Sequence, residues 1–481
     1  MVLEELSALA AAAAIRRGEL RAETYAEALL ERCRRAAHLN AFIALDGDAV
    51  LESARAADQA RTAGRPLGPL HGVPLVLKDN IDTAQMATTA GTPALKSHRP
   101  RQNAPVAERL FAAGALLLGK ANMHELAFGI TSNNAAFGPV RNPYDPTRIA
   151  GGSSGGTGAA IAARLAPAGL GTDTGGSVRI PAALTGIAGL RPTAGRWPQA
   201  GIVPISHTRD TPGPMARSLA DCALLDRIVT GEADDPAPRS LKGLRLGVPR
   251  GYFWADLDGE LAVLLEAALD RLRAAGALLI EGDIPDVEAL DAAAGFPIAL
   301  HEARTDLDAY LRGHDSSLDF AALAQAAASP DVRGILGSQL GAGRMPDDAY
   351  HAAMTRHRPA LQAAYRDYFR SRDVSAVVFP TTPLPAVPLG QDETVSLNGR
   401  DAPIFVTFIR NTGPGSLAGI PGLTLPAGLT ASGLPVGIEF DAPAGHDRDL
   451  LAIGLAAEAI LPPIPAPKLA ADATEAAAIR S

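Results

Sequence analysis

Residues 151–193 read GGSSGGTGAAIAARLAPAGLGTDTGGSVRIPAALTGIAGLRPT, and no other stretch of the chain has this composition. It is dense in Gly, Ser and Thr and nearly free of charge. Solvent-exposed loops usually carry charged side chains, whereas this stretch carries backbone freedom and hydroxyl groups. We therefore predict that residues 151–191 form a buried, functional loop system.

Two groups of serines and glycines lie within this stretch. Ser153 and Ser154 are flanked by glycines on both sides, and Ser177 follows Gly175 and Gly176. Glycine has no Cβ, so its backbone N–H can approach a bound anion closely. Two glycines before a serine allow successive amides to form an oxyanion hole around that serine's target. The alternative interpretation is a glycine-rich turn that caps a helix at Ser177.

Upstream of this stretch, residues 72–77 (GVPLVL) have the pattern of a buried strand that runs directly into Lys78. Burial disfavours an ammonium ion and lowers its pKa, which would make Lys78 a base. Asp79 would oppose that shift if it paired with Lys78, but consecutive residues of a strand point to opposite faces. The alternative is a surface lysine with an apolar stem.

Two further motifs match other functions less well. Residues 151–155 satisfy G-x-S-x-G, the nucleophile elbow of α/β-hydrolases, which needs a preceding strand and a later histidine. His446 is such a histidine, but residues 145–150 have the pattern of a turn. Residues 114–121 (GALLLGKA) nearly fit a phosphate-binding loop, except that Ala121 stands where magnesium needs Ser or Thr. An apolar interior favours a buried strand end for residues 114–121.

The 151–193 stretch closely resembles the signature block of the amidase signature family. The order and spacing of Lys78, Ser153 and Ser177 resemble those of the family's lysine–serine–serine triad. The similarity continues at residues 119–125 (GKANMHE), 213–217 (GPMAR), 380–383 (PTTP) and 433–437 (GLPVG). It therefore covers nearly the whole chain, from about residue 6 to about residue 461.

The resemblance implies a role for each matching position. Ser177 would be the nucleophile, Ser153 would pass its proton onward, and neutral Lys78 would accept the proton as general base. The family's bridging serine follows a cis peptide bond, which here would join Gly152 to Ser153. The backbone N–H groups that would hold the oxyanion belong to Thr174, Gly175, Gly176 and Ser177. Asp173 and Arg179 would brace the loop. No metal or organic cofactor is implied.

The reaction that the resemblance implies is hydrolysis of a C–N bond through an acyl-enzyme. Residues 195–210 (GRWPQAGIVPISHTRD) look most like the family branch of indoleacetamide and mandelamide hydrolases, which act on small aryl amides. An uncharged wall before the block consists of Phe128, Gly129, Ile130 and Thr131, and favours a small, uncharged aryl or alkyl carboxamide. Carbamate or anilide hydrolysis stays open as an alternative. A role as amidase subunit of a tRNA-dependent amidotransferase is the alternative of another class.

The order of the predicted elements alternates between helices and strands, which is typical of an α/β protein. The resemblance implies a single large domain with a mixed, twisted sheet covered by helices on both faces. No linker interrupts the chain, so we assign residues 1–465 to this domain, with a helical lobe inserted at about 230–375. Residues 466–481 are rich in Pro and Ala and are predicted to be a loosely held tail.

Composition limits the partners and the compartment. The 481 residues carry 44 Lys and Arg against 52 Asp and Glu, and this acidic balance argues against nucleic-acid binding. The sequence contains no run of about 18 uncharged apolar residues, so we expect no membrane span. Only Cys33 and Cys222 are present, which favours a reducing cytoplasm. The histidines lack the spacing of a metal site, because His124-Glu125 and His301-Glu302 are not followed by a second histidine. We therefore expect no metal and a small amide as the partner, with a homodimer as one option.

Overall fold

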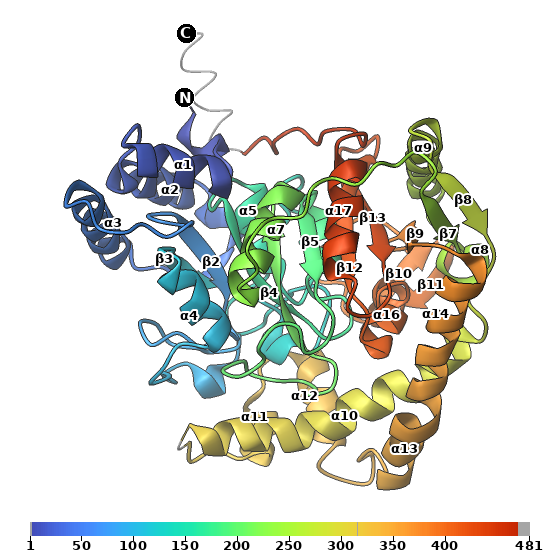
Figure 1. The fold of residues 1–481 in the computed structure, drawn as a ribbon. Helices are drawn as coiled ribbons and strands as arrows, with labels where there is room; N and C mark the ends of the chain where they lie inside the picture. The colour runs from blue at the N-terminus through green and yellow to red at the C-terminus, as the bar shows by residue number, and fades with distance from the viewer. Residues whose placement is uncertain (1, 315, 470–481) are drawn as a thin grey trace.

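The computed structural model describes residues 2–314 and 316–469, and one large β-sheet forms its centre (Figure 1). Its strands follow the order β1-β3-β2-β4-β6-β5-β12-β13-β9-β7-β8, and β10 and β11 form a separate hairpin. The strands are β1 (Phe42–Ala44), β2 (Pro74–Lys78), β3 (Leu116–Ala121), β4 (Ala168–Asp173), β5 (Ala188–Arg191), β6 (Thr211–Ala216), β7 (Arg245–Val248), β8 (Leu278–Glu281), β9 (Ala376–Pro380), β10 (Thr394–Leu397), β11 (Arg400–Pro403), β12 (Gly422–Leu429) and β13 (Pro435–Asp441).

Helices flank this sheet and extend below it (Figure 1). They are α1 (Ala8–Arg17), α2 (Ala22–Arg35), α3 (Gly47–Thr62), α4 (Pro105–Ala112), α5 (Gly155–Ala162), α6 (Arg179–Thr185), α7 (Leu219–Thr230), α8 (Arg250–Phe253), α9 (Gly259–Ala274), α10 (Val287–Gly313), α11 (Phe320–Ala326), α12 (Pro330–Ser338), α13 (Asp347–Ala352), α14 (Arg358–Arg372), α15 (Ile404–Ile409), α16 (Gly413–Ala418) and α17 (Asp447–Glu458). None of these helices in the described ranges is long and apolar enough to cross a membrane.

The sheet is mixed, and both of its faces are covered. Strand β2 runs parallel to β3 and β4, whereas β4 pairs antiparallel with β6 and β12 pairs antiparallel with β13. Every residue of β2, β4, β5, β6, β9 and β13 is buried. Because consecutive side chains point to opposite faces, continuous burial requires packing on both faces. The predicted fold class, a single α/β domain with a mixed sheet between helices, is confirmed.

The parallel pairing of β2 and β4 brings distant residues to one edge of the sheet. Leu77 pairs with Leu170, and both strands end within a few residues of that pair. Parallel strands end at the same edge, so Lys78 at the end of β2 lies beside Thr172 near the end of β4. The loops that follow these strands therefore converge on the same edge.

The signature block is buried as predicted, but the prediction of a loop system is wrong. Residues 151–191 contain α5, β4, α6 and β5, with only short connections between them. All eight residues of α5 are buried. A helix that is buried all round has no polar face, so it lacks the amphipathic periodicity by which a helix is recognised in a sequence.

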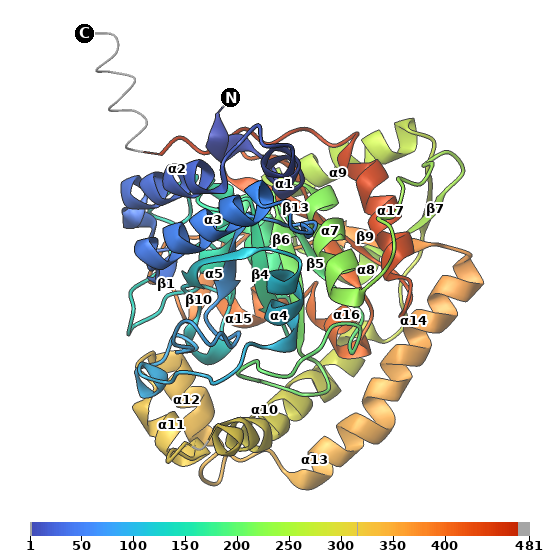
Figure 2. The same cartoon turned by 60° about the vertical axis from the view of Figure 1, so that its left-hand side comes forward.

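The predicted helical lobe at 230–375 also contributes strands to the main sheet. Strand β7 lies between β8 and β9 at one end of the sheet, so this part of the range belongs to the central layer. Helices α10, α11, α12 and α13 lie together below the sheet in both views (Figures 1 and 2). Of the predicted tail, residues 470–481 lie outside the described residues.

Candidate active site

Lys78 is fully buried at the end of β2 and has three hydrogen-bond acceptors around its ammonium group. Its Nζ lies 2.7 Å from Ser153 Oγ and 2.7 Å from Thr172 Oγ1, and 3.4 Å from the Thr172 carbonyl oxygen. Asn80 Nδ2 donates to the same Thr172 hydroxyl at 3.1 Å. The surface-lysine interpretation is therefore wrong, and Thr172 and Asn80 are positioning residues that the sequence did not reveal.

Burial lowers the pKa of Lys78 to about 7, and the more distant charges of Asp173 and Asp210 only partly oppose this shift. No carboxylate of the described residues lies within ion-pair distance of Nζ. Burial disfavours the charged form of an amine unless an opposite charge compensates it. Lys78 can therefore exchange a proton near neutral pH, as a general base must.

Asp79 points away from Lys78, as the alternation of strand side chains predicts. Its carboxylate accepts a hydrogen bond from the Thr89 backbone N–H at 3.0 Å and lies 3.7 Å from Lys120 Nζ. Lys120 belongs to the segment that nearly fits a phosphate-binding loop, and it is fully buried in β3. The prediction of a buried strand for that segment is confirmed.

Ser153 and Ser177 lie at the ends of two different helices. Ser153 follows a cis peptide bond with Gly152 and is fully buried, and its backbone C=O accepts from the His124 N–H at 3.1 Å. Ser177 precedes α6 and is 9% exposed. The Ser154 N–H donates to the Ser177 carbonyl at 3.2 Å and ties the two segments together. Among residues 2–314 and 316–469, the Ser177 hydroxyl has no hydrogen-bond partner.

The loop that carries Ser177 is held by the buried carboxylate of Asp173. This carboxylate accepts from the backbone N–H of Gly176 at 2.7 Å and of Val178 at 3.2 Å. Arg179 binds it through two nitrogens, each at 3.1 Å, and Arg191 Nη1 lies 3.2 Å away. Burial alone would raise the pKa of Asp173, but the two guanidinium groups outweigh it and hold that pKa well below its usual range. Asp173 and Arg179 therefore brace the loop, as predicted.

The same contacts correct the predicted oxyanion hole. The Gly176 N–H already donates to Asp173, so it is not available to an oxyanion. The backbone N–H groups of Thr174, Gly175 and Ser177 have no partner among the described residues, and these three residues border the cavity beside Ser177. The sequence could not show this difference, because it depends on where the Asp173 side chain turns.

A cavity of about 430 Å³ opens in front of Ser177. It is lined by Phe128, Gly129 and Ile130 from the predicted wall, and by apolar side chains of α10, α12 and α15. Thr131 does not line it, contrary to the prediction, because its hydroxyl turns toward His124 at 3.3 Å and Asp392 at 3.1 Å. Four charged residues of the lining were missed, since nothing in their local sequence sets them apart: Arg209, Glu288, Asp291 and Arg410.

The histidines are less scattered in space than in sequence. Asp82, His98 and His314 bring ligand-type atoms within 4.8 Å of one another, as do His207, Glu302 and Asp306. In the first group, Tyr310 Oη donates to Asp82 at 2.8 Å, and His314 Nε2 lies 3.0 Å from the same carboxylate. These contacts join the end of α10 to the loop after β2. Neither group includes a residue of the predicted triad.

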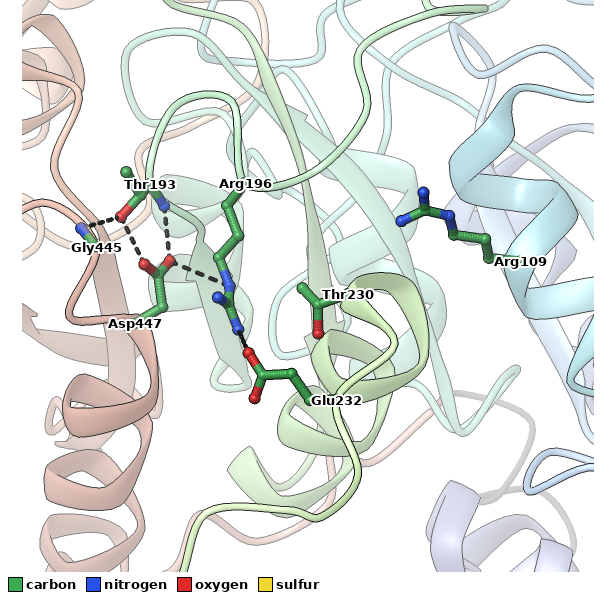
Figure 3. A pocket seen from close by; sticks show the side chains of 7 residues that line it. All are labelled: Arg109, Thr193, Arg196, Thr230, Glu232, Gly445 and Asp447. Atoms are coloured by element: carbon green, nitrogen blue, oxygen red, sulfur yellow. Dashed lines mark hydrogen bonds and ion pairs between the residues drawn. The ribbon is translucent and has the colours of Figure 1, made fainter.

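A second pocket lies elsewhere on the surface, and its polar groups already bind one another (Figure 3). Asp447 accepts hydrogen bonds from the Thr193 N–H at 2.7 Å and hydroxyl at 2.6 Å. Arg196 reaches Glu232 at 2.7 Å, and Arg109 lies apart from this group. Because the carboxylates of this pocket are paired and no serine, cysteine or lysine lines it, the cavity at Ser177 is the stronger candidate for the active site.

Known proteins resemble this chain over most of its length. The family model named Amidase matches residues 25–451. Indoleacetamide hydrolase from Agrobacterium vitis is 47% identical over 432 residues, which is 90% of this chain and 92% of the relative. Mandelamide hydrolase from Pseudomonas putida is 42% identical over 480 residues, which is 97% of this chain and 93% of the relative. The structure of native peptide amidase from Stenotrophomonas maltophilia superposes with a TM-score of 0.83 at 31% identity. The superposition covers 97% of this chain and 99% of the peptide amidase.

These similarities define the class of this protein as an enzyme that hydrolyses C–N bonds of amides. More particularly, the chain belongs to the amidase signature family, and the predicted family membership is confirmed. The assignment of individual residues to catalytic roles stays a prediction.

Asp173→Asn is expected to lower the free energy of unfolding by about 3–5 kcal/mol, because it leaves the guanidinium groups of Arg179 and Arg191 buried without their shared counter-ion. Urea unfolding at pH 7 measures this loss. The pKa of Asp173 is lowered in the fold, so its contribution is present above the ordinary carboxyl pKa of about 4 and fades only as the pH falls below it. The control Asp145→Asn removes a partly exposed carboxylate and should cost less than about 1 kcal/mol. A similar small loss for Asp173→Asn would show that Glu439 and Asp441 suffice to neutralise the arginines.

Proposed function

We propose that this protein is a serine-dependent amidohydrolase that cleaves small, uncharged aryl or alkyl carboxamides through an acyl-enzyme and releases ammonia or an amine. The observation that carries the proposal is Lys78, a buried amine with a pKa of about 7 that lies 2.7 Å from Ser153 Oγ. Ser177 lines the cavity of about 430 Å³, and its hydroxyl has no partner of its own in the described chain. Lys78 and Ser153 are in direct contact, and the hydrogen bond from the Ser154 N–H to the Ser177 carbonyl supports a place for Ser177 beside them.

The proton path follows from these contacts. Neutral Lys78 accepts the proton of Ser153, and Ser153 takes the proton of Ser177 as Ser177 Oγ attacks the amide carbonyl. The Thr172 hydroxyl and carbonyl accept the remaining N–H groups of Lys78, so its lone pair is directed toward Ser153. The Ser153–Ser177 hydrogen bond forms when substrate is bound, since catalytic hydrogen bonds often tighten only in the complex.

The charge that develops on the carbonyl oxygen is held by the free N–H groups of Thr174, Gly175 and Ser177. Collapse of the tetrahedral intermediate breaks the C–N bond, and Lys78 returns its proton to the leaving nitrogen through Ser153. A water molecule then attacks the acyl-enzyme by the same path and releases the acid. No step requires a histidine.

The substrate class rests on the cavity wall and on the relatives. Phe128, Gly129 and Ile130 provide no charge beside Ser177, and this suits a neutral acyl group. Carbamates and anilides remain the alternative substrates, because the same triad would cleave them. We also assign the enzyme to the cytoplasm, because Cys33 and Cys222 are buried free thiols that need no oxidising compartment.

A screen of the purified protein for ammonia release tests the proposed substrate class. Aryl acetamides are expected to give the highest kcat/KM, ahead of aliphatic amides and carbamates, because the cavity wall is apolar. Glutamine should be a poor substrate, since Phe128, Gly129 and Ile130 offer no counter-ion to its charged ammonium and carboxylate groups. A clear preference for glutamine would instead favour a subunit of an amidotransferase.

Ser177→Ala should lower kcat by a factor on the order of 10⁴ to 10⁶ and leave the fold intact, because it removes the nucleophile but no core volume. Steady-state hydrolysis of a good amide, with thermal unfolding as the check on folding, measures this. Ser371→Ala on α14 is the matched control and should behave as the wild type. If Ser177→Ala kept near-normal activity while Ser153→Ala was inactive, Ser153 would be the nucleophile, as in the elbow interpretation.

The pH profile tests the role of Lys78. The base must be neutral before attack, so kcat/KM should be low below the pKa of about 7, rise through it and stay high at alkaline pH. Lys78→Ala should cost as much as loss of the nucleophile at pH 7. Lys78→Arg should not restore activity, because arginine stays charged and cannot accept a proton. Substantial activity of Lys78→Arg would mean that only the positive charge is needed.

A further inference from the structure

The wall of the active-site cavity contains a carboxylate that the proposed mechanism does not use. Asp291 lies in the second turn of α10 and borders the cavity together with Ser177. Within residues 2–314 and 316–469, its carboxylate has no hydrogen-bond donor and no ion-pair partner. An unpaired carboxylate in a protein wall costs free energy unless a ligand or water satisfies it.

Arg209 is the cation that would be expected to pair with Asp291, but its guanidinium binds a backbone carbonyl instead. It is 5% exposed, and its Nη1 donates to the Gly295 carbonyl at 2.7 Å. It lies beside the nucleophile loop, since a Cβ on Gly175 would be 3.4 Å from Arg209 Nη2. Asp291 lies between Arg209 and α16: a Cβ on Gly295 would be 3.6 Å from its Oδ1 and 3.8 Å from Arg209 Nη1, and a Cβ on Gly413 would be 3.3 Å from its Oδ2. The two charges therefore share the cavity without forming an ion pair.

Asp291 keeps its charge at neutral pH. Burial raises its pKa to about 6, and the guanidinium of Arg209 limits this rise. Glu288 and Arg410 also line the cavity, and the rest of its wall is formed largely by apolar side chains, among them Phe128, Phe296, Phe405 and Ile409. Glu288 is exposed, whereas Asp291 is half-buried, so Asp291 is the more enclosed anionic acceptor of this cavity.

We propose that Asp291 is a specificity-determining residue that accepts a hydrogen bond from an N–H or O–H group on the aryl part of the substrate. This inference rests on the proposed function and narrows its substrate class to aryl amides with such a donor. A neutral donor fits better than an ammonium group, because the charged residues that line the cavity already balance: Arg209 and Arg410 against Glu288 and Asp291. Amides of similar shape without the donor leave the carboxylate unpaired and are poorer substrates.

The test compares two bicyclic amides, indole-3-acetamide, which carries a ring N–H, and 1-naphthaleneacetamide, which has none. The wild type should have a kcat/KM at least about tenfold higher for the indole substrate, as expected for a hydrogen bond to a charged acceptor. Asp291→Leu is close in size but cannot accept, so its ratio of the two kcat/KM values should fall to about one. Its activity on the naphthalene substrate should be retained or increased, because the cost of the unpaired carboxylate is gone.

Asp291→Asn keeps one acceptor oxygen without the charge, so its ratio of the two kcat/KM values should lie between those of the wild type and Asp291→Leu. This variant keeps the inference testable if Asp291→Leu does not fold. Asp367→Leu removes an exposed carboxylate from α14 and should leave the ratio unchanged. An equal loss of activity on both substrates, or a wild-type ratio near one, would overturn the inference and leave the proposed function standing. Hydrolysis of neither amide by the wild type would overturn the proposed substrate class, and the inference with it.

Discussion

The removal of the Lys78 amine from water is the constraint on which the chemistry of this protein depends. An amine in water carries its proton well above neutral pH, whereas Lys78 is enclosed by β2, β4 and the Ser153 segment and meets only neutral oxygen atoms. Its surroundings therefore favour the form that can accept a proton. The fold achieves this by continuous burial of the central strands, so that Lys78 is fully buried at the end of β2.

Two other buried cations of the fold differ from Lys78 in that each has a carboxylate as its partner. Lys120 lies on the next strand and has Asp79 at 3.7 Å, and Arg179 is bound by Asp173 through two nitrogens. In both cases a carboxylate faces the cation, and the pair serves to hold neighbouring segments. Lys78 differs from both, because no carboxylate among the described residues forms an ion pair with its amine. Neutral hydroxyl groups bind the amine of Lys78 without stabilising its charge strongly.

The enzyme divides its tasks between rigid and variable parts. The ends of β2 and β4 and the starts of α5 and α6 hold the base, the serines and the free amides, and the Asp173 cluster fixes this frame. The outer wall of the cavity comes from α10, α12 and α15, which belong to more peripheral parts of the chain. Binding residues on such elements can change without disturbing the catalytic frame. Asp291 on α10 illustrates this arrangement, because it borders the cavity but has no hydrogen-bond or ion-pair partner among the described residues.

The sequence by itself determined the family, the fold class and the positions of Lys78, Ser153 and Ser177, because these depend on local motifs and their spacing. It did not reveal strand β6, because the residues TPGPMA contain two prolines, which are uncommon inside a sheet. The two prolines are two positions apart, and alternate N–H groups of a strand face the same neighbour. Strand β6 therefore lacks hydrogen-bond donors toward only one of its two neighbours. Only the tertiary structure decided that Gly176 is engaged, that Thr131 turns away and that Asp291 enters the cavity. Each of these outcomes depends on contacts between residues far apart in the chain, since solvation and hydrogen bonding are properties of the packed surroundings rather than of the local sequence.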